Sequence, residues 1–176
     1  GKTLTSTAAK LHNLAITDAN NDVGSVTVTA LDAKADADLS NVSLHASATK
    51  TANVANDVTF TGNLGGFGVV VANGKTLTST SAKLDGIAVT EAVGHNATTK
   101  VSDTSISANA NLSGVQTNAI AFGNGSTDIT PAVGVILSIR EAHLTNIVGD
   151  SGADASIKDG SDTGHVKIYE FTGDHD

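Results

Sequence analysis

Four aspartates near the C-terminus have the residue type and the spacing for binding a cation. Asp150, Asp154, Asp159 and Asp162 stand among Gly and Ser, which predicts that they lie on turns where several oxygen atoms converge. Calcium takes roughly six to eight oxygen ligands from carboxylates, amide side chains and backbone carbonyls. Residues 147–176 hold seven carboxylates and two lysines, and so carry −5 of the net charge of −8. We expect either calcium at these four aspartates or a solvated acidic tail without an ion.

A second acidic stretch resembles the start of an EF-hand loop. Asp18-Ala-Asn20-Asn-Asp22 offers oxygen donors at the first, third and fifth positions of such a loop. The sixth position is Val23 where Gly is required, and the twelfth is Thr29 where a bidentate Glu belongs. These two departures exclude an EF-hand. The stretch is predicted to be a polar turn between two strands, and ion binding there stays open.

The motifs that suggest catalysis fail on inspection. Gly74-Lys-Thr76 matches the end of a phosphate-binding loop, but the first glycine of that loop would stand at Val69. Gly149-Asp-Ser151-Gly152 matches the nucleophile segment of chymotrypsin-like proteases, yet the chain is too short for their double barrel. The six histidines are scattered, without the spacing of a zinc helix. We therefore expect no enzymatic activity.

The acidic segment also contains one degenerate nonapeptide. In Gly149-Asp-Ser-Gly152-Ala-Asp154-Ala-Ser-Ile157, Gly149, Gly152 and Asp154 match the nonapeptide of RTX calcium-binding β-rolls. Asp150 replaces the second glycine and Ser156 replaces the apolar residue. Together with its composition, the chain thus resembles type I secreted bacterial surface proteins, which include RTX-like adhesins and S-layer proteins. This resemblance implies a calcium-binding adhesin domain or a self-assembling surface layer.

The elements that would position such sites come from an internal duplication. Residues 1–42 resemble residues 74–115 at a shift of 73 with no gap; Gly1-Lys-Thr-Leu-Thr-Ser-Thr7, for example, recurs as Gly74-Lys-Thr-Leu-Thr-Ser-Thr80. Repeats of this kind bury their apolar faces by stacking one copy on the next. We divide the chain into a first copy (1–73), a second copy (74–146) and an acidic C-terminal segment (147–176).

A shorter motif gives the period of the stack. The pattern Ala, any residue, Leu, any residue, Asn or Gly, then an aliphatic residue occupies residues 9–14, 37–42, 82–87, 110–115 and 142–147. The small residue and the Leu are expected to face inward with a polar residue between them, and a corner follows. Its leucines lie 28, 45, 28 and 32 residues apart. This predicts a β-solenoid with roughly 20 to 30 residues per coil and one coil without the motif. A β-sandwich of duplicated halves is the alternative.

Composition favours an all-β, extracellular chain. There is no Cys, aromatic residues make up 3%, and helix formers other than Ala and Leu are scarce. The acidic balance argues against nucleic-acid binding, and no stretch approaches the roughly 20 apolar residues that would span a membrane. Because position 1 is not Met and no signal-like segment is present, we expect a mature or excised piece of a longer protein.

We therefore expect a non-enzymatic structural module of a secreted or cell-surface protein, whose partners are copies of itself or neighbouring surface proteins. Residues 62–71 join the two copies and are expected to supply a bend or a contact. One further alternative is an ice-binding β-solenoid. Threonine pairs such as Thr3 and Thr5, Thr27 and Thr29, and Thr76 and Thr78 are predicted to lie on outer strand faces, although their spacing along the chain is irregular.

Overall fold

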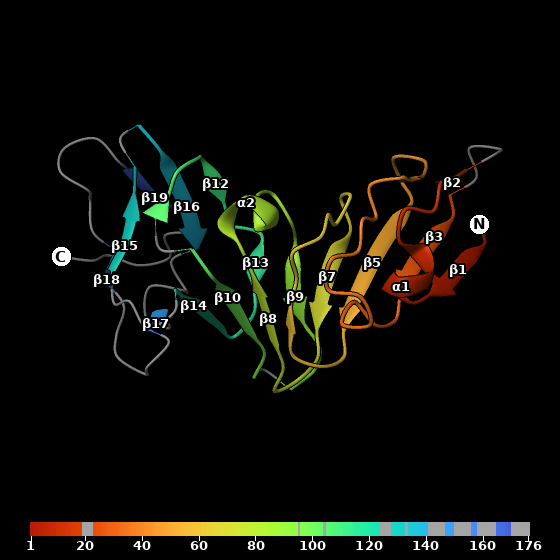
Figure 1. Ribbon diagram of the computed structural model, residues 1–176, viewed down its shortest axis with the longest axis horizontal. Helices are drawn as coiled ribbons and strands as arrows, with labels where there is room; N and C mark the ends of the chain where they lie inside the picture. The colour runs from red at the N-terminus through yellow and green to blue at the C-terminus, as the bar shows by residue number, and fades with distance from the viewer. Residues whose placement is uncertain are drawn as a thin grey trace.

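The computed structural model shows an elongated β-solenoid, whose coils stack along the long axis of the molecule (Figure 1). It describes residues 1–18, 23–94, 96–103, 105–123, 128–132, 134–140, 147–149, 156–157 and 165–169. Every strand pair among these residues is parallel. The predicted all-β solenoid is confirmed, and the sandwich alternative is wrong, because a sandwich of this kind pairs its strands antiparallel.

The longest sheet, which we call the six-stranded sheet, receives its strands from successive coils. In order they are β1 (Thr3–Ser6), β3 (Ser25–Val28), β5 (Thr49–Val54), β7 (Gly68–Val71), β9 (Val89–Glu91) and β13 (Val115–Gln116). Neighbouring partners such as Thr3 and Ser25 are 22 residues apart, whereas Thr51 and Gly68 are only 17 apart and Val89 and Val115 are 26 apart. The coils therefore differ in length around the predicted period.

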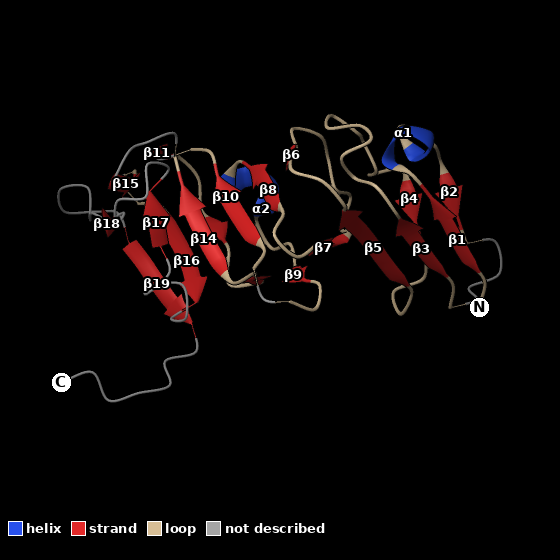
Figure 2. Ribbon diagram, turned by 90° about the horizontal axis from the view of Figure 1, so that it is seen from below, coloured by secondary structure: helices blue, strands red, loops and turns tan. Residues whose placement is uncertain are grey.

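Four further sheets and two short helices complete the coils (Figures 1 and 2). The five-stranded sheet has the order β17 (Ile147–Gly149), β14 (Ala119–Phe122), β10 (Thr98–Val101), β8 (Thr76–Ser79) and β6 (Val58–Thr59). The two three-stranded sheets contain β11 (Ser105–Ile106), β15 (Asp128–Pro131) and β18 (Ser156–Ile157), and β12 (Ala110–Asn111), β16 (Ile136–Arg140) and β19 (His165–Tyr169). The last sheet pairs β2 (Ile16–Thr17) with β4 (Val42–Ser43), and the helices are α1 (Ala8–Leu11) and α2 (Ser81–Leu84). Neither helix is long enough to cross a membrane, and no other helix of the described residues is.

The core consists of rows of apolar side chains in register from coil to coil. One row in the six-stranded sheet runs through Val28, Ala52, Val69, Val89 and Val115, all of which are buried. Since each layer contributes only one or two small side chains per sheet, the solenoid can close its interior with few aromatic residues. This explains how a chain with 3% aromatics forms a core.

The motif leucines confirm the predicted row. Leu11, Leu39, Leu84 and Leu112 are all buried, and Leu64 fills the place of the coil without the motif. The Leu39 amide donates to the carbonyl oxygen of Asn63 in the next coil at 2.9 Å. Leu144 lies outside the described residues.

The alternation expected within the motif holds in two of the four copies that the structure describes. Ala37 and Ala110 are buried as predicted, but Ala9 and Ala82 are exposed. The reason is that the chain forms the single helical turns α1 and α2 at these two places. In a helix the residue three positions before the Leu shares its face, so Ala8 takes the inner position in α1. Ser81 does the same in α2.

The two copies of the duplication occupy different sheets. Strands β1 and β3 of the first copy lie in the six-stranded sheet, whereas their counterparts β8 and β10 lie in the five-stranded sheet. The pairing is nevertheless the same, because Thr3 faces Ser25 as Thr76 faces Thr98. The same pairing between strands therefore recurs in two different sheets.

The junction between the copies contains a tight turn at Gly65 and Gly66. Gly65 and Gly66 have φ of 58° and 77°, a conformation that glycine adopts without strain. The Lys50 side chain donates to the carbonyl oxygen of Gly65 and lies 5.5 Å from the centre of the Phe67 ring. In β7, Val69 and Val71 are buried, so neither side chain is available for a contact with another molecule.

Candidate functional site

The edge strand β1 exposes part of the apolar interior of the solenoid. Leu4 in this strand is 41% exposed, whereas Leu77 at the same place of the identical sequence in β8 is 0% exposed. The difference has a simple cause: β8 is flanked on both sides, by β6 and β10, while β1 pairs only with β3 among the described strands. The surface that is covered in the second copy is thus open in the first.

A depression lies beside Leu4 at this end of the molecule. It encloses about 310 Å³, and its lining includes Leu4, Ile16, Val26 and Leu44 from successive segments of the first two coils. Lys2, Thr3, Thr17, Asp18, Gly24 and Ser25 complete the lining. The apolar part is continuous with the core, because Val26 is buried and both Ile16 and Leu44 pack against the core. The end of the solenoid therefore combines an apolar floor with a polar rim.

The backbone of β1 adds hydrogen-bonding groups that no other described strand pairs with. The carbonyl oxygens of Lys2 and Ser6 accept hydrogen bonds from the Ser25 and Thr29 amides, at 3.0 Å and 2.8 Å. Backbone groups of alternate residues point to opposite sides of a strand, so those of Thr3 and Thr5 point away from β3. An edge of this kind can template the addition of another strand.

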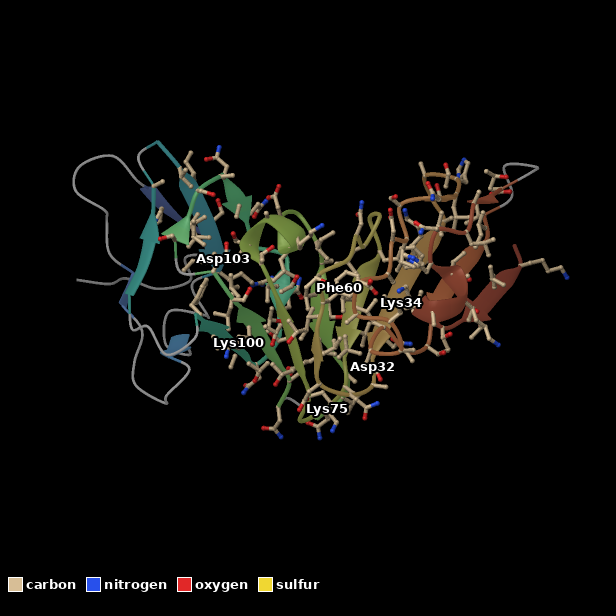
Figure 3. All side chains as sticks on the ribbon, in the orientation of Figure 1. Asp32, Lys34, Phe60, Lys75, Lys100 and Asp103 are labelled. Atoms are coloured by element: carbon tan, nitrogen blue, oxygen red, sulfur yellow. The ribbon has the colours of Figure 1, made fainter. Side chains whose placement is uncertain are left out.

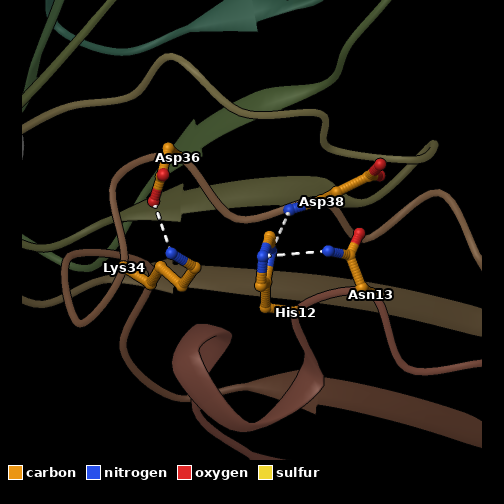
Figure 4. Close-up of polar contacts among 5 residues, drawn as sticks. All are labelled: His12, Asn13, Lys34, Asp36 and Asp38. Atoms are coloured by element: carbon orange, nitrogen blue, oxygen red, sulfur yellow. Dashed lines mark hydrogen bonds and ion pairs between the residues drawn. The ribbon is translucent and has the colours of Figure 1, made fainter.

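The first corner of the solenoid is held by His12 (Figure 4). The Asp38 amide donates to His12 Nδ1 at 3.0 Å, and Asn13 Nδ2 lies 3.0 Å from His12 Nε2. Beside it, Lys34 Nζ and Asp36 Oδ1 form an ion pair at 2.8 Å. These contacts give His12 a structural role at the corner.

The second copy makes the same hydrogen bond with another residue type. Asp85, which stands 73 residues after His12, accepts a hydrogen bond from the Asn111 amide through Oδ1 at 2.8 Å. Asn111 in turn corresponds to Asp38. The pair of His12 and Asp38 in the first copy thus corresponds to the pair of Asp85 and Asn111 in the second copy. Each pair contains one carboxylate.

Side chains at the corners also cap the turns that follow them. Asp38 Oδ1 accepts hydrogen bonds from the amide and hydroxyl of Ser40 at 2.9 Å and 2.6 Å, and Asn111 Oδ1 does the same for Ser113. The hydroxyl and the amide of Ser40 hold the pKa of the Asp38 carboxyl below its ordinary value of 3.8. Asp38 and Asn111 lie on the outer side as predicted, but their side chains stabilise the corner as well.

The contacts around Thr76 agree with the rejection of a phosphate-binding loop. The Thr76 amide, which such a loop would direct at a phosphate, donates to Asp57 Oδ1 at 2.9 Å. A carboxylate thus occupies the place where an anion would bind. A second carboxylate, Asp103, accepts hydrogen bonds from the amide and hydroxyl of Ser81 at the start of α2.

The predicted calcium ligands cannot be placed. Asp150, Asp154, Asp159 and Asp162 lie outside the described residues, and of Asp18, Asn20 and Asp22 only the first lies within them. Across the described part of the chain, no group of three or more His, Cys, Asp or Glu side chains is arranged to hold a metal ion.

Comparisons with known proteins add no assignment to this geometry. The chain matches no protein-family model, no curated protein sequence and no solved structure. Any function must therefore be argued from the residues and their arrangement.

Proposed function

We propose that the chain is a non-enzymatic structural module of a secreted or cell-surface protein, which assembles end to end by adding a coil to the edge strand β1. One observation carries the proposal. Leu4 and Leu77 occupy the same position of identical strands, and only Leu77 is covered. An exposed leucine at the end of an apolar stack favours association, because covering it removes apolar surface from water.

The covering of β8 supports the choice of partner for this edge. Its counterpart β8 is covered by β6, with Val58 facing Leu77 and Thr59 facing Thr78. A strand that pairs with β1 in this register would place an aliphatic side chain over Leu4. We therefore name as the partner a second copy of this chain or a neighbouring surface protein that carries the same kind of coil.

Variants of β1 test the assembly directly. Leu4→Lys places a charge on the apolar end, and Thr5→Pro removes an amide from the free side of the strand without touching the β1–β3 ladder. Val93→Lys is the matched control, because Val93 is 98% exposed on a turn and its substitution adds the same charge elsewhere. Sedimentation velocity over a range of protein concentrations and electron microscopy measure the assembly.

We expect the unmodified chain and Val93→Lys to form elongated oligomers as the concentration rises, and both β1 variants to stay monomeric with unchanged circular dichroism. A chain that stays monomeric at all concentrations would refute assembly by the chain alone. Oligomers that persist in both β1 variants would show that another surface mediates assembly.

A further inference from the structure

Six hydroxyl groups form a regular array on the outer face of the first three strands of the six-stranded sheet. The first row pairs Thr3, Ser25 and Thr49, and the second row pairs Thr5, Thr27 and Thr51. In β3, Val26 between the two hydroxyl-bearing residues and Val28 after them are buried. The alternation along each strand therefore directs the six hydroxyl-bearing side chains outward. Figure 2 shows the three strands side by side at one end of the molecule.

The array is periodic in two directions. Parallel strands lie about 4.7–4.9 Å apart, and alternate residues of one strand lie roughly 6.6 Å apart. Two of the hydroxyl groups are close enough to form a hydrogen bond, since Thr3 Oγ1 and Ser25 Oγ are 2.8 Å apart. None of the six positions carries a charged, aromatic or large aliphatic side chain. The face therefore combines hydroxyl groups with the methyl groups of five threonines.

The corresponding face of the second copy lacks this regularity. In the five-stranded sheet Thr76 faces Thr98 and then Ala119, while Thr78 faces Lys100 and then Ala121. Lys100 stands at the position that corresponds to Thr27, 73 residues earlier (Figure 3). The fold thus accepts a lysine at this place, and the array is a property of the first copy alone.

We propose that the array of Thr3, Thr5, Ser25, Thr27, Thr49 and Thr51 binds the surface of ice. Each hydroxyl can donate and accept a hydrogen bond, as each lattice water does. The absence of charge from the array matches a neutral lattice, since a charged side chain would hold its own hydration shell against the surface.

Other neutral partners fit the face less well. A single sugar chain is commonly bound on an aromatic side chain that stacks on the ring, and the array offers none. A small soluble ligand would bind in a concave pocket, whereas these side chains stand on the outer face of a sheet. An uncharged and periodic face is best matched by an uncharged and periodic partner.

Inhibition of ice recrystallisation by the purified full chain tests the proposal. Thr27→Lys should abolish the inhibition, and it should fold, because β10 carries Lys100 in the same register. Thr78→Lys is the matched control, since it makes the same substitution in the five-stranded sheet and should leave the inhibition unchanged. Leu4→Lys keeps all six hydroxyl groups, so it separates ice binding from end-to-end assembly.

Inhibition by the unmodified chain that is lost in Thr27→Lys and kept in Thr78→Lys and Leu4→Lys would support the array. If the unmodified chain inhibits no more than an unrelated protein at equal concentration, the proposal is wrong. Equal inhibition by Thr27→Lys and Thr78→Lys would also overturn it. So would retention of the chain on microcrystalline cellulose or chitin without any effect on ice.

Discussion

Replacing each of two equivalent leucines with alanine should have very different costs. Leu77→Ala removes a side chain that is completely buried between two strands, and such a change costs about 2 to 5 kcal/mol, because a cavity remains. Leu4→Ala removes the same atoms from a residue that is 41% exposed and borders an open depression. At about 0.8 kcal/mol per buried methylene and without a closed cavity, we expect a cost of roughly 1 to 1.5 kcal/mol.

Urea unfolding followed by far-ultraviolet circular dichroism measures both costs, since the chain has no Trp for fluorescence. The experiment is done first at a concentration where the protein is monomeric. Equal costs for Leu4→Ala and Leu77→Ala there would refute the argument that only the second leucine is covered. At concentrations where the protein assembles, the cost of Leu4→Ala should rise toward that of Leu77→Ala, because assembly stabilises the covered state by mass action.

Three further predictions follow from the corners, the carboxylates and the acidic segment. His12→Asp alone should destabilise the chain by about 1 kcal/mol, because it places a second carboxylate beside Asp38, and adding Asp38→Asn should restore the stability, as a thermal double-mutant cycle can show. Burial raises the pKa of Asp32, but hydrogen bonds from Asn56 and nearby amides outweigh this effect and hold it below 3.8. Its contribution to stability is therefore present above pH 4 and lost as the pH falls through the lowered pKa, so unfolding by urea should depend less on acid pH in Asp32→Asn. If the aspartates of residues 150–162 bind calcium, calorimetric titration should show heat of binding, and melting should occur at a lower temperature in chelator.

The period of the solenoid could be predicted from the spacing of the motif leucines. Their unequal gaps required one coil without the motif, and Leu64 lies 25 residues after Leu39 and 20 before Leu84. The sheet that each strand joins could not be predicted in this way. It depends on the summed lengths of all preceding coils. Because coil length changes from one coil to the next, the sequence does not fix which sheet the strands of the second copy join.

Two local features were missed for physical reasons. In Ala8-Ala9-Lys10-Leu11, a small residue stands both two and three positions before the Leu. The sequence is therefore equally consistent with a strand that buries Ala9 and with the observed helical turn that buries Ala8. The contribution of β5 to the hydroxyl array could not be predicted from the sequence. Lys50 stands between Thr49 and Thr51, and a lysine is expected on the outer face of a strand. In the structure Lys50 points inward, where its ammonium group donates to carbonyl oxygens of Val42 and Gly65.

The duplicated copies keep what the coil needs and differ where the surface is free to change. The pairing between β1 and β3 returns unchanged in β8 and β10, and so do the buried leucines at the corners. The corner hydrogen bond survives the exchange of His12 for Asp85, because Asp38 changes to Asn111 and no second carboxylate is added. On the outer face, by contrast, Thr27 has become Lys100 without any compensating change that restores the array. A face that differs in this way is not required for folding, and the function of the first copy is best sought in the residues that the second copy has not retained.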